Sequence, residues 1–214
     1  MSGLKIPFLN GLTANDPVFT ASLLQVSGTM FNIDKINWNE FPHLIGVKVY
    51  SGYCDQYLWL DYQVGSELIR AVCKEDQDPV WQDSCVEFFI KQGDFYRNFE
   101  FNAFGICLSA YGTDRHSRKS LDRDSLNQIL RFPSFTLETL PGEGTPQSWS
   151  LTVAIPLQLI GLKAGSEFRA NFYKCGDETS FPHYISWSPI GTLNPDFHQP
   201  AYFGLVKLED KIKS

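Results

Sequence analysis

The sequence predicts an all-β protein: a two-sheet antiparallel β-sandwich with jelly-roll-like or immunoglobulin-like layering and one or two short helical turns. Short runs rich in aromatic and β-branched residues recur along the 214 residues, and many alternate apolar with polar side chains. Gly, Pro, Asn and Asp separate the runs, and helical periodicity is almost absent. No linker or internal repeat divides the chain, so residues 1–214 are expected to form a single domain.

The expected strands follow one another at short intervals, because each apolar run ends at residues that favour turns. Gly52 and Gly65 end the first two runs, and the acidic, proline-containing residues 76–79 end the third. In chain order, strands are expected at residues 43–50, 57–64, 68–74, 84–91, 96–111, 129–139, 149–155, 168–174, 183–187 and 203–208.

Helical structure is expected in two short segments. Residues 156–160 begin with proline and are followed by Gly161, which suits one helical turn. Residues 120–130 carry Asp and Asn near their start and a short amphipathic pattern. The first 40 residues are expected to run along an edge of the sandwich.

Two neighbouring runs separate apolar from polar side chains most clearly. The face expected in the core carries Val86, Phe88, Ile90, Phe99, Phe101 and Ala103. The opposite face carries Glu87, Phe89, Glu100 and Asn102. Residues 91–96, which include Gly93 and Asp94, suit a hairpin loop. In such a hairpin Glu87 would lie close to Asn102, and Phe89 close to Glu100.

This polar face lies next to an indole, because Trp81 shortly precedes the first of the two strands. Carboxylates and an amide beside an aromatic plate are what a sugar-binding surface requires. The ordinary alternative is that Glu87, Glu100 and Asn102 are solvent-facing strand residues and that Trp81 only covers the core.

The composition excludes several classes of partner. The net charge is −6, and the basic cluster at residues 115–123 is diluted by aspartates, so neither nucleic acid nor an anionic membrane surface is expected to bind. No signal-peptide pattern or membrane-spanning run occurs. As written, the chain is expected in the cytoplasm, or in a secreted or periplasmic location if a leader has been removed.

No cofactor is predicted. The five cysteines have no metal or redox spacing and are expected to be free thiols; they are Cys54, Cys73, Cys85, Cys107 and Cys175. The four histidines also lack the spacing of a zinc site. Asp76, Asp78 and Asp83 could supply oxygen ligands to a structural calcium ion, although an ordinary acidic loop is the favoured interpretation.

The segment from Trp81 through the residues Asp-Ser-Cys-Val-Glu-Phe at 83–88 and on to Asn102 resembles the family-nine carbohydrate-binding modules. Later segments at residues 149–156 and 168–173, and the closing run from residue 183 to 204, match that family in order and spacing. The resemblance covers roughly residues 40–208. It implies a β-sandwich that binds polysaccharides such as xylan or cellulose, in association with a polysaccharide-degrading enzyme.

The resemblance also implies a set of site residues. In the sugar-binding members two tryptophans sandwich a terminal sugar; Trp81 matches the first and Trp187 is assigned to the second. Glu87 and Asn102 match positions that bond the sugar hydroxyls. Glu100 departs from the pattern, because the binding members carry an arginine there. This exchange removes five hydrogen-bond donors and reverses a charge.

The predicted function is therefore non-catalytic recognition of a sugar or polysaccharide chain end, with Trp81, Glu87, Glu100, Asn102 and Trp187 as the site. One alternative is a glycoside hydrolase that uses Glu87 and Glu100 as its carboxylate pair. Another is a sandwich scaffold that has lost sugar binding and mediates protein contacts. The loop at residues 195–200 is interpreted as a structural crossover, with a role in binding as the alternative.

Overall fold

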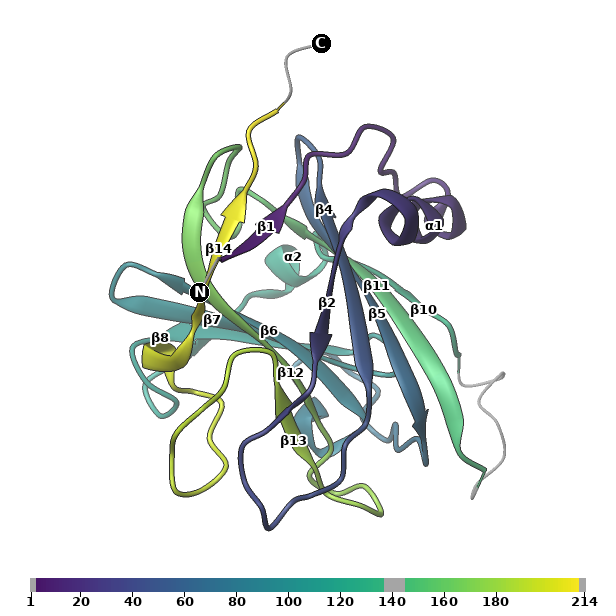
Figure 1. The fold of residues 1–214 in the computed structure, drawn as a ribbon, viewed down its shortest axis with the longest axis vertical. Helices are drawn as coiled ribbons and strands as arrows, with labels where there is room; N and C mark the ends of the chain where they lie inside the picture. The colour runs from purple at the N-terminus through teal and green to yellow at the C-terminus, as the bar shows by residue number, and fades with distance from the viewer. Residues whose placement is uncertain (1–2, 137–144, 212–214) are drawn as a thin grey trace.

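The computed structural model of the protein describes residues 3–136 and 145–211, and it confirms the predicted all-β sandwich. Two sheets pack face to face (Figure 1), antiparallel throughout except where β1 and β14 pair in parallel. The end of the strand expected at residues 129–139 lies outside the described residues. None of the described helices has the length and apolar character needed to cross a bilayer.

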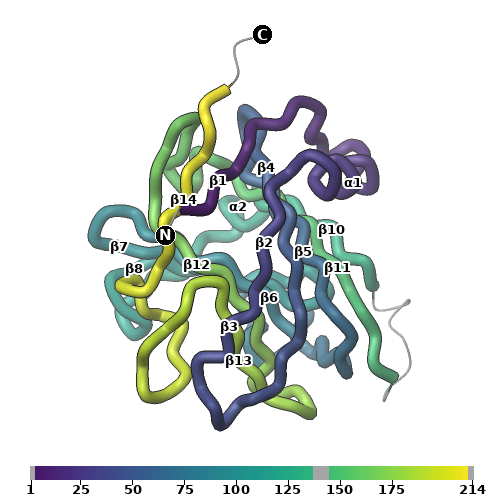
Figure 2. Tube along the Cα trace, viewed as in Figure 1, coloured from purple at the N-terminus to yellow at the C-terminus, as the bar shows by residue number. Residues whose placement is uncertain are grey.

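The three longest strands of the larger sheet, β12, β6 and β7, lie side by side in the middle of the sheet. Its main path, in spatial order, is β1 (Leu4–Ile6), β14 (Gly204–Leu208), β12 (Glu167–Cys175), β6 (Cys85–Gln92), β7 (Phe95–Asn102), β8 (Cys107–Gly112) and β9 (Lys119–Ser120). Off this path, β13 (Tyr184–Ser186) pairs with β12, and β3 (Lys35–Ile36) pairs with β13 (Figure 2).

The smaller sheet and the short helices complete the fold. In spatial order the sheet runs β10 (Leu130–Pro133), β11 (Gln147–Pro156), β5 (Tyr57–Glu67), β4 (Val47–Tyr53) and β2 (Thr29–Ile33). The helices are α1 (Pro17–Ser27), η1 (Val80–Gln82), α2 (Arg123–Leu126) and η2 (Pro200–Tyr202). Helix α1 packs beside the smaller sheet, on the opposite side of the molecule from β7 and β8 (Figure 1).

The main core lies between the two sheets and contains the face that the alternating pattern predicted. Phe88 of β6 stacks on Phe172 of β12 with ring centroids 5.1 Å apart, and all six residues predicted for the core face of this hairpin are fully buried. A second apolar cluster covers the outer face of the larger sheet, where Phe89 and Tyr173 meet Phe197 and Phe203 from the C-terminal loops. Polar groups on this outer face are therefore enclosed by protein rather than by bulk water.

The β6–β7 hairpin differs from the expected one in its turn and register. The strands continue to Gln92 and Phe95, so that only two residues form the turn, and Gly93 adopts a φ of +61°. A glycine with positive φ at the first turn position is typical of a type II′ turn. In the register of this hairpin Glu87 lies opposite Glu100 and not, as expected, close to Asn102.

Three other segments differ from the expected strands and edges. Residues 68–74 form a loop, because the amides of Val72 and Cys73 donate to the Asp83 carboxylate instead of to a strand. The strand expected at 96–111 is two strands, β7 and β8. The N-terminal edge contains the unexpected helix α1, whose start Asp16 caps by accepting from Phe19 N at 2.9 Å.

Candidate functional site

A pocket of about 350 Å³ opens on the outer face of the larger sheet. Its floor follows one row across the sheet, in which Glu87, Glu100 and Leu108 are successive partners on β6, β7 and β8. Loops after β8, β12 and β13 form the walls. The lining residues are Trp81, Glu87, Glu100, Leu108, Arg115, His116, Arg118, Cys175, Asp177, Tyr184, Pro195, Asp196, Phe197 and His198.

The floor contains two buried carboxylates with the same arrangement. Glu87 and Glu100 are only 2% and 3% exposed. Each has one anchored oxygen: Oε1 of Glu87 accepts from the Cys175 thiol at 3.1 Å, and Oε1 of Glu100 accepts from Asn98 Nδ2 at 3.0 Å. Both Oε2 atoms are buried and have no hydrogen-bond partner among the described residues. The pocket floor therefore offers two acceptors that a ligand could satisfy.

Burial governs the protonation of this pair. It raises the pKa of Glu87 well above its usual range, and the nearby Cys175 and Glu100 raise it further. Burial also raises the pKa of Glu100 to about 7, although Arg118, with Nη1 3.9 Å from Oε1, acts in the opposite direction. Near neutral pH the ligand-free floor is therefore partly protonated.

This raised pKa predicts a dependence of stability on pH. An unfolded glutamate titrates near pH 4.3, so between that pH and about 7 the folded state holds more protons at Glu100 than the unfolded state does. The stability that Glu100 contributes is complete below the lower value and is lost as the pH rises through the higher one. We expect the free energy of unfolding of the wild type, relative to Glu100→Gln, to fall by about 2 kcal/mol from pH 5 to pH 8.

Urea unfolding of both proteins at the two pH values measures this difference. Groups that do not interact with Glu100 titrate alike in both proteins and cancel in the comparison, whereas the change also includes the effect of Glu100 on its neighbour Glu87. Glu167→Gln, on an exposed part of β12, is the matched control and is expected to show no such change. If the free energies of unfolding of the wild type and Glu100→Gln differ by the same amount at both pH values, the prediction is contradicted.

Trp81 lies at the edge of the pocket with 39% of its side chain exposed. It belongs to η1, the turn that leads into β6. The backbone of this turn is tied to the loop after β12, because Asp177 N donates to Trp81 O at 3.2 Å and Glu178 N donates to Gln82 O at 3.0 Å. The indole is therefore held in place by its backbone while much of its surface remains available.

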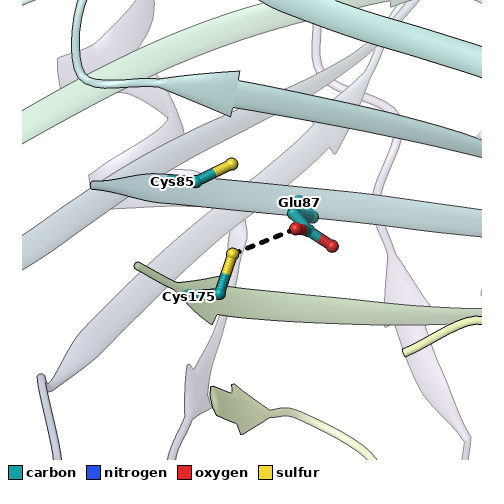
Figure 3. A group of neighbouring side chains, drawn as sticks. All are labelled: Cys85, Glu87 and Cys175. Atoms are coloured by element: carbon teal, nitrogen blue, oxygen red, sulfur yellow. Dashed lines mark hydrogen bonds between the residues drawn. The ribbon is translucent and has the colours of Figure 1, made fainter. Parts of the chain in front are cut away.

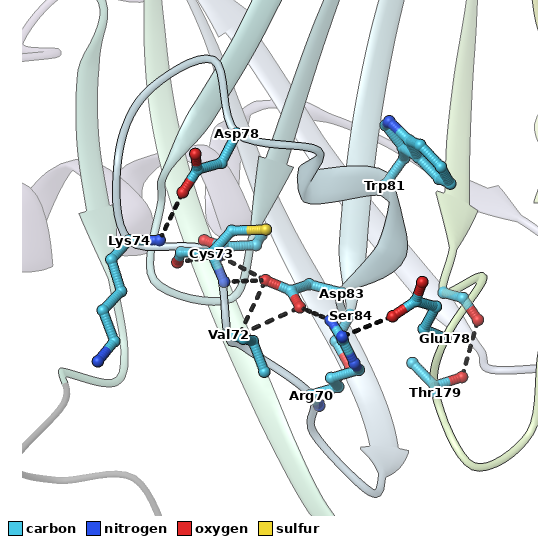
Figure 4. A network of polar contacts seen from close by, with 12 residues as sticks. Arg70, Val72, Cys73, Lys74, Asp78, Trp81, Asp83, Ser84, Glu178 and Thr179 are labelled. Atoms are coloured by element: carbon cyan, nitrogen blue, oxygen red, sulfur yellow. Dashed lines mark hydrogen bonds and ion pairs between the residues drawn. The ribbon is translucent and has the colours of Figure 1, made fainter.

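A buried carboxylate fixes the same turn from behind (Figure 4). Asp83 accepts from Val72 N and Cys73 N at 3.0 Å each and forms an ion pair with Arg70. Arg70 also contacts Glu178, with Nη2 2.7 Å from Oε2. This network joins the 70–73 loop, η1 and the loop after β12, so that one edge of the pocket is preorganised.

Asn102, predicted as a ligand contact, has no capacity left for a ligand. Its amide nitrogen donates to Cys73 O and Asp83 Oδ2, at 3.0 Å each. Its amide oxygen accepts from Phe104 N and Ile106 N, at 3.1 and 3.0 Å. A carboxamide makes four hydrogen bonds in total, and all four are used here: two hold the β7–β8 turn, and two join it to Cys73 and Asp83. The predicted role of Asn102 in binding is therefore corrected to a structural one.

Trp187, predicted as the second aromatic plate, lies away from the pocket. It packs against the main core, with its ring centroid 5.9 Å from that of Phe31 and 5.7 Å from that of Phe172. The expected pair of facing tryptophans is thus not formed. The wall of the pocket instead contains Phe197, which stacks on Tyr173 with centroids 4.1 Å apart.

The position of Trp187 can be tested through Gly204. A Cβ atom at Gly204 would come within 2.4 Å of the Trp187 ring, so we expect Gly204→Ala to destabilise the fold by about 1–3 kcal/mol through overpacking and to leave the pocket unchanged. Denaturant unfolding measures the loss. Gly46→Ala is the control, because a Cβ there meets no atom within 4 Å. Equal stability of the two variants would contradict this packing.

Several pocket residues were not predicted as ligand contacts. Arg115, Arg118, Asp177, Tyr184 and His198 all come from loops or strand ends. The available signals were the basic cluster at 115–123 and the proline-bounded loop at 195–200. This loop lines the pocket, so its alternative interpretation as part of a site agrees better with the structure than a purely structural crossover does.

Two of these wall residues have altered pKa values. Burial, assisted by the charges of Arg118 and Arg115, lowers the pKa of His198 to about 3, and its Nδ1 lies 2.9 Å from the Tyr96 hydroxyl. His198 is thus neutral at physiological pH. Burial raises the pKa of Asp177 to about 6.

The proposed calcium ligands have other partners. Asp83 is held by Arg70 and backbone amides, and Asp78 accepts from the amides of Lys74 and Glu75. Asp76 forms an ion pair with Arg131, with a shortest N–O distance of 2.6 Å. The three carboxylates therefore serve separate local contacts and do not form a common oxygen cage.

A different cluster has the composition of a metal site. Cys85, Glu87 and Cys175 bring three ligand atoms within 4.8 Å of one another (Figure 3). Burial raises the pKa of Cys85 to about 12 and that of Cys175 well above its usual range. Metals bind the thiolate, so the protonated, hydrogen-bonded form is favoured here. None of the five cysteines forms a disulfide.

Comparison with known proteins agrees with this architecture. The family model for carbohydrate-binding family 9 matches residues 19–208. A candidate carbohydrate-binding protein from Bacteroides uniformis ATCC 8492 is 31% identical with a TM-score of 0.82, over 97% of this chain and all of that one. No curated protein matches significantly.

Two structures of family 9 modules from Caldicellulosiruptor kristjanssonii share the fold. The one solved with cellotriose is 11% identical with a TM-score of 0.59, over 98% of this chain and 94% of its own. The one solved with glucose is 13% identical with a TM-score of 0.55, over 98% of both chains. With a family model matching nearly its whole length, this chain belongs to carbohydrate-binding family 9.

Proposed function

We propose that this protein binds a sugar or a polysaccharide chain end in the pocket above Glu87 and Glu100, without catalysing a reaction. The observation that carries the proposal is the pair of buried Oε2 atoms without partners, beside an exposed indole. A sugar has an apolar face that can stack on Trp81 and hydroxyl groups that can donate to the two carboxylates.

The size and walls of the pocket fit such a ligand. Its volume, about 350 Å³, lies at the lower end of the range for small-molecule sites, about 300–1,000 Å³. Arg115 and Arg118 can donate to sugar oxygens, and Asp177 can accept from hydroxyls. A pocket of this size holds one or two sugar units, which suits a chain end better than the middle of a polymer.

The relatives suggest the first ligands to test. Family 9 modules have been solved with glucose and with cellotriose, so we propose gluco-configured sugars as the starting class and xylo-oligosaccharides as the second. The protein is proposed to act beside a polysaccharide-degrading enzyme, bringing it to its substrate.

Isothermal titration calorimetry with glucose, cello-oligosaccharides, xylo-oligosaccharides and amino sugars tests the proposal. We expect saturable binding of at least one of them at a single site. The absence of binding by every sugar would overturn the proposal. Release of reducing sugar from the same oligosaccharides, lost in Glu100→Gln, would instead identify a hydrolase.

A further inference from the structure

The charge on the pocket floor indicates which kind of sugar it selects. Glu87 and Glu100 are direct cross-strand partners, a position in which Cβ atoms lie about 4.5–5.5 Å apart. Two carboxylates at this distance repel each other when both are ionised. We propose that the pocket selects a sugar bearing a protonated amine, with the ammonium group seated between Glu87 and Glu100. This inference rests on the proposed function and deepens it.

The protein itself supplies little countercharge to the pair. Among the residues that the structure describes, no lysine or arginine lies within 4.0 Å of the Glu87 carboxylate. Arg118 approaches Glu100 only to 3.9 Å and gives its hydrogen bond to Asn98 Oδ1 at 2.9 Å. In the ligand-free pocket this lack of countercharge is met by partial protonation of the pair. An ammonium seated between Glu87 and Glu100 can replace those protons and stabilise the ionised carboxylates.

The hydrogen-bonding capacity of the floor supports the same ligand. Each free Oε2 atom requires a donor and has none within the described residues. An ammonium has three donors and no acceptor, whereas a hydroxyl has one donor. One ammonium can therefore donate to both Glu87 and Glu100, and its positive charge offsets one of their two negative charges. Hydroxyl groups satisfy the oxygens but leave the repulsion between the carboxylates.

The pocket walls do not reverse this charge. Asp177 and Asp196 lie in the walls. Together with Glu87 and Glu100 they give the pocket four carboxylates, compared with two arginines. Arg115 lies 3.9 Å from Asp196, so its nearest carboxylate belongs to the wall, and its charge also lowers the pKa of Glu100 from a greater distance. When these four carboxylates are ionised, the net charge of the pocket is negative and its field favours a cation.

The test compares sugars that differ only in the amine. The ligands are glucosamine, its isomer with the amine on the sixth carbon, N-acetylglucosamine and glucose. Each is titrated into the full chain by calorimetry at about pH 6.5, where a sugar amine is protonated. Chelator is present throughout, so that a metal ion cannot act as the cation. We expect at least one amine to bind about 10-fold or more tightly than glucose and N-acetylglucosamine.

Two variants locate the effect. Glu87→Gln and Glu100→Gln keep the side-chain shape and remove the charge, and we expect each to reduce the amine preference to about 3-fold or less. Glu167→Gln, on exposed β12 surface, should retain the full preference. Circular dichroism and unfolding curves confirm that each variant is folded.

The outcomes separate this inference from the proposed function. Equal affinity for glucose and both amines would overturn the amine preference and leave sugar binding intact. An amine preference that survives in both floor variants would also overturn it, because the ammonium would then be held elsewhere. Failure of every sugar to bind would overturn the proposed function together with this inference.

Discussion

Replacing Trp81 by alanine will weaken sugar binding by at least about 30-fold, a loss of about 2 kcal/mol. The indole is the most exposed large aromatic side chain of the described pocket lining, at 39%, and its turn is held on both sides by hydrogen bonds. Stacking on a preorganised ring costs little conformational entropy. Calorimetric titration of the best-binding sugar with wild type and variant measures the loss.

Phe19→Ala is the matched control. Phe19 is also an exposed aromatic residue, at 51%, but it lies on α1 beside the smaller sheet. We expect the Phe19→Ala variant to bind the sugar with the affinity of the wild type. If Trp81→Ala and Phe19→Ala bind the sugar equally well, the ligand does not stack on this indole, and its binding must depend on the carboxylate floor alone.

The alternation of side chains made the two faces of the β6–β7 hairpin predictable. A strand has a period of two, so Val86, Phe88 and Ile90 could be assigned to the core without knowledge of the partner strand. The expected partner of Glu87 was wrong by two positions along β7. A loop at residues 91–96 makes Ile90 and Arg97 the closing pair, and counting back from that pair already places Glu87 opposite Glu100.

The site residues show a second limit of the sequence. Asn102 has the residue type and the strand face of a ligand contact, but its four partners come from three separate segments of the chain. Only the fold brings these segments together. Trp187 likewise follows a short strand whose continuation turns toward the core. Residue type predicts what a side chain can bind, while the packing decides whether it remains free to do so.

The pocket walls come from the parts of the chain with the weakest patterns. Arg118 and His198 lie in loops 80 residues apart in sequence, and neither loop has a periodicity that would place it over the sheet. The cover over the outer face arises because Phe89 and Tyr173 are apolar on a face that would otherwise be solvated. Two large aromatic residues on the polar face of a strand pair are therefore a signal that loops cover it.

Replacing Asp83 by alanine will destabilise the fold by about 3–5 kcal/mol. The carboxylate is fully buried and accepts from two backbone amides, from Asn102 and from Arg70. Its removal leaves the guanidinium of Arg70 without this partner and the amides of Val72 and Cys73 without this acceptor. Urea unfolding measures the change. Asp34→Ala removes an exposed ion pair with Lys35 and is expected to cost less than about 1 kcal/mol.

Asp83→Asn distinguishes the charge from the hydrogen bonds. Asparagine keeps one acceptor oxygen but presents an amide nitrogen to donors. We therefore expect Asp83→Asn to have a stability between that of Asp83→Ala and that of the wild type. The same variants should weaken sugar binding, because Asp83 and Arg70 together hold η1 and Glu178 beside the pocket. A stability loss as small as that of Asp34→Ala would mean that the 70–73 loop can rearrange without this carboxylate. The indole of Trp81 would then owe its position to the backbone contacts with Asp177 and Glu178 alone.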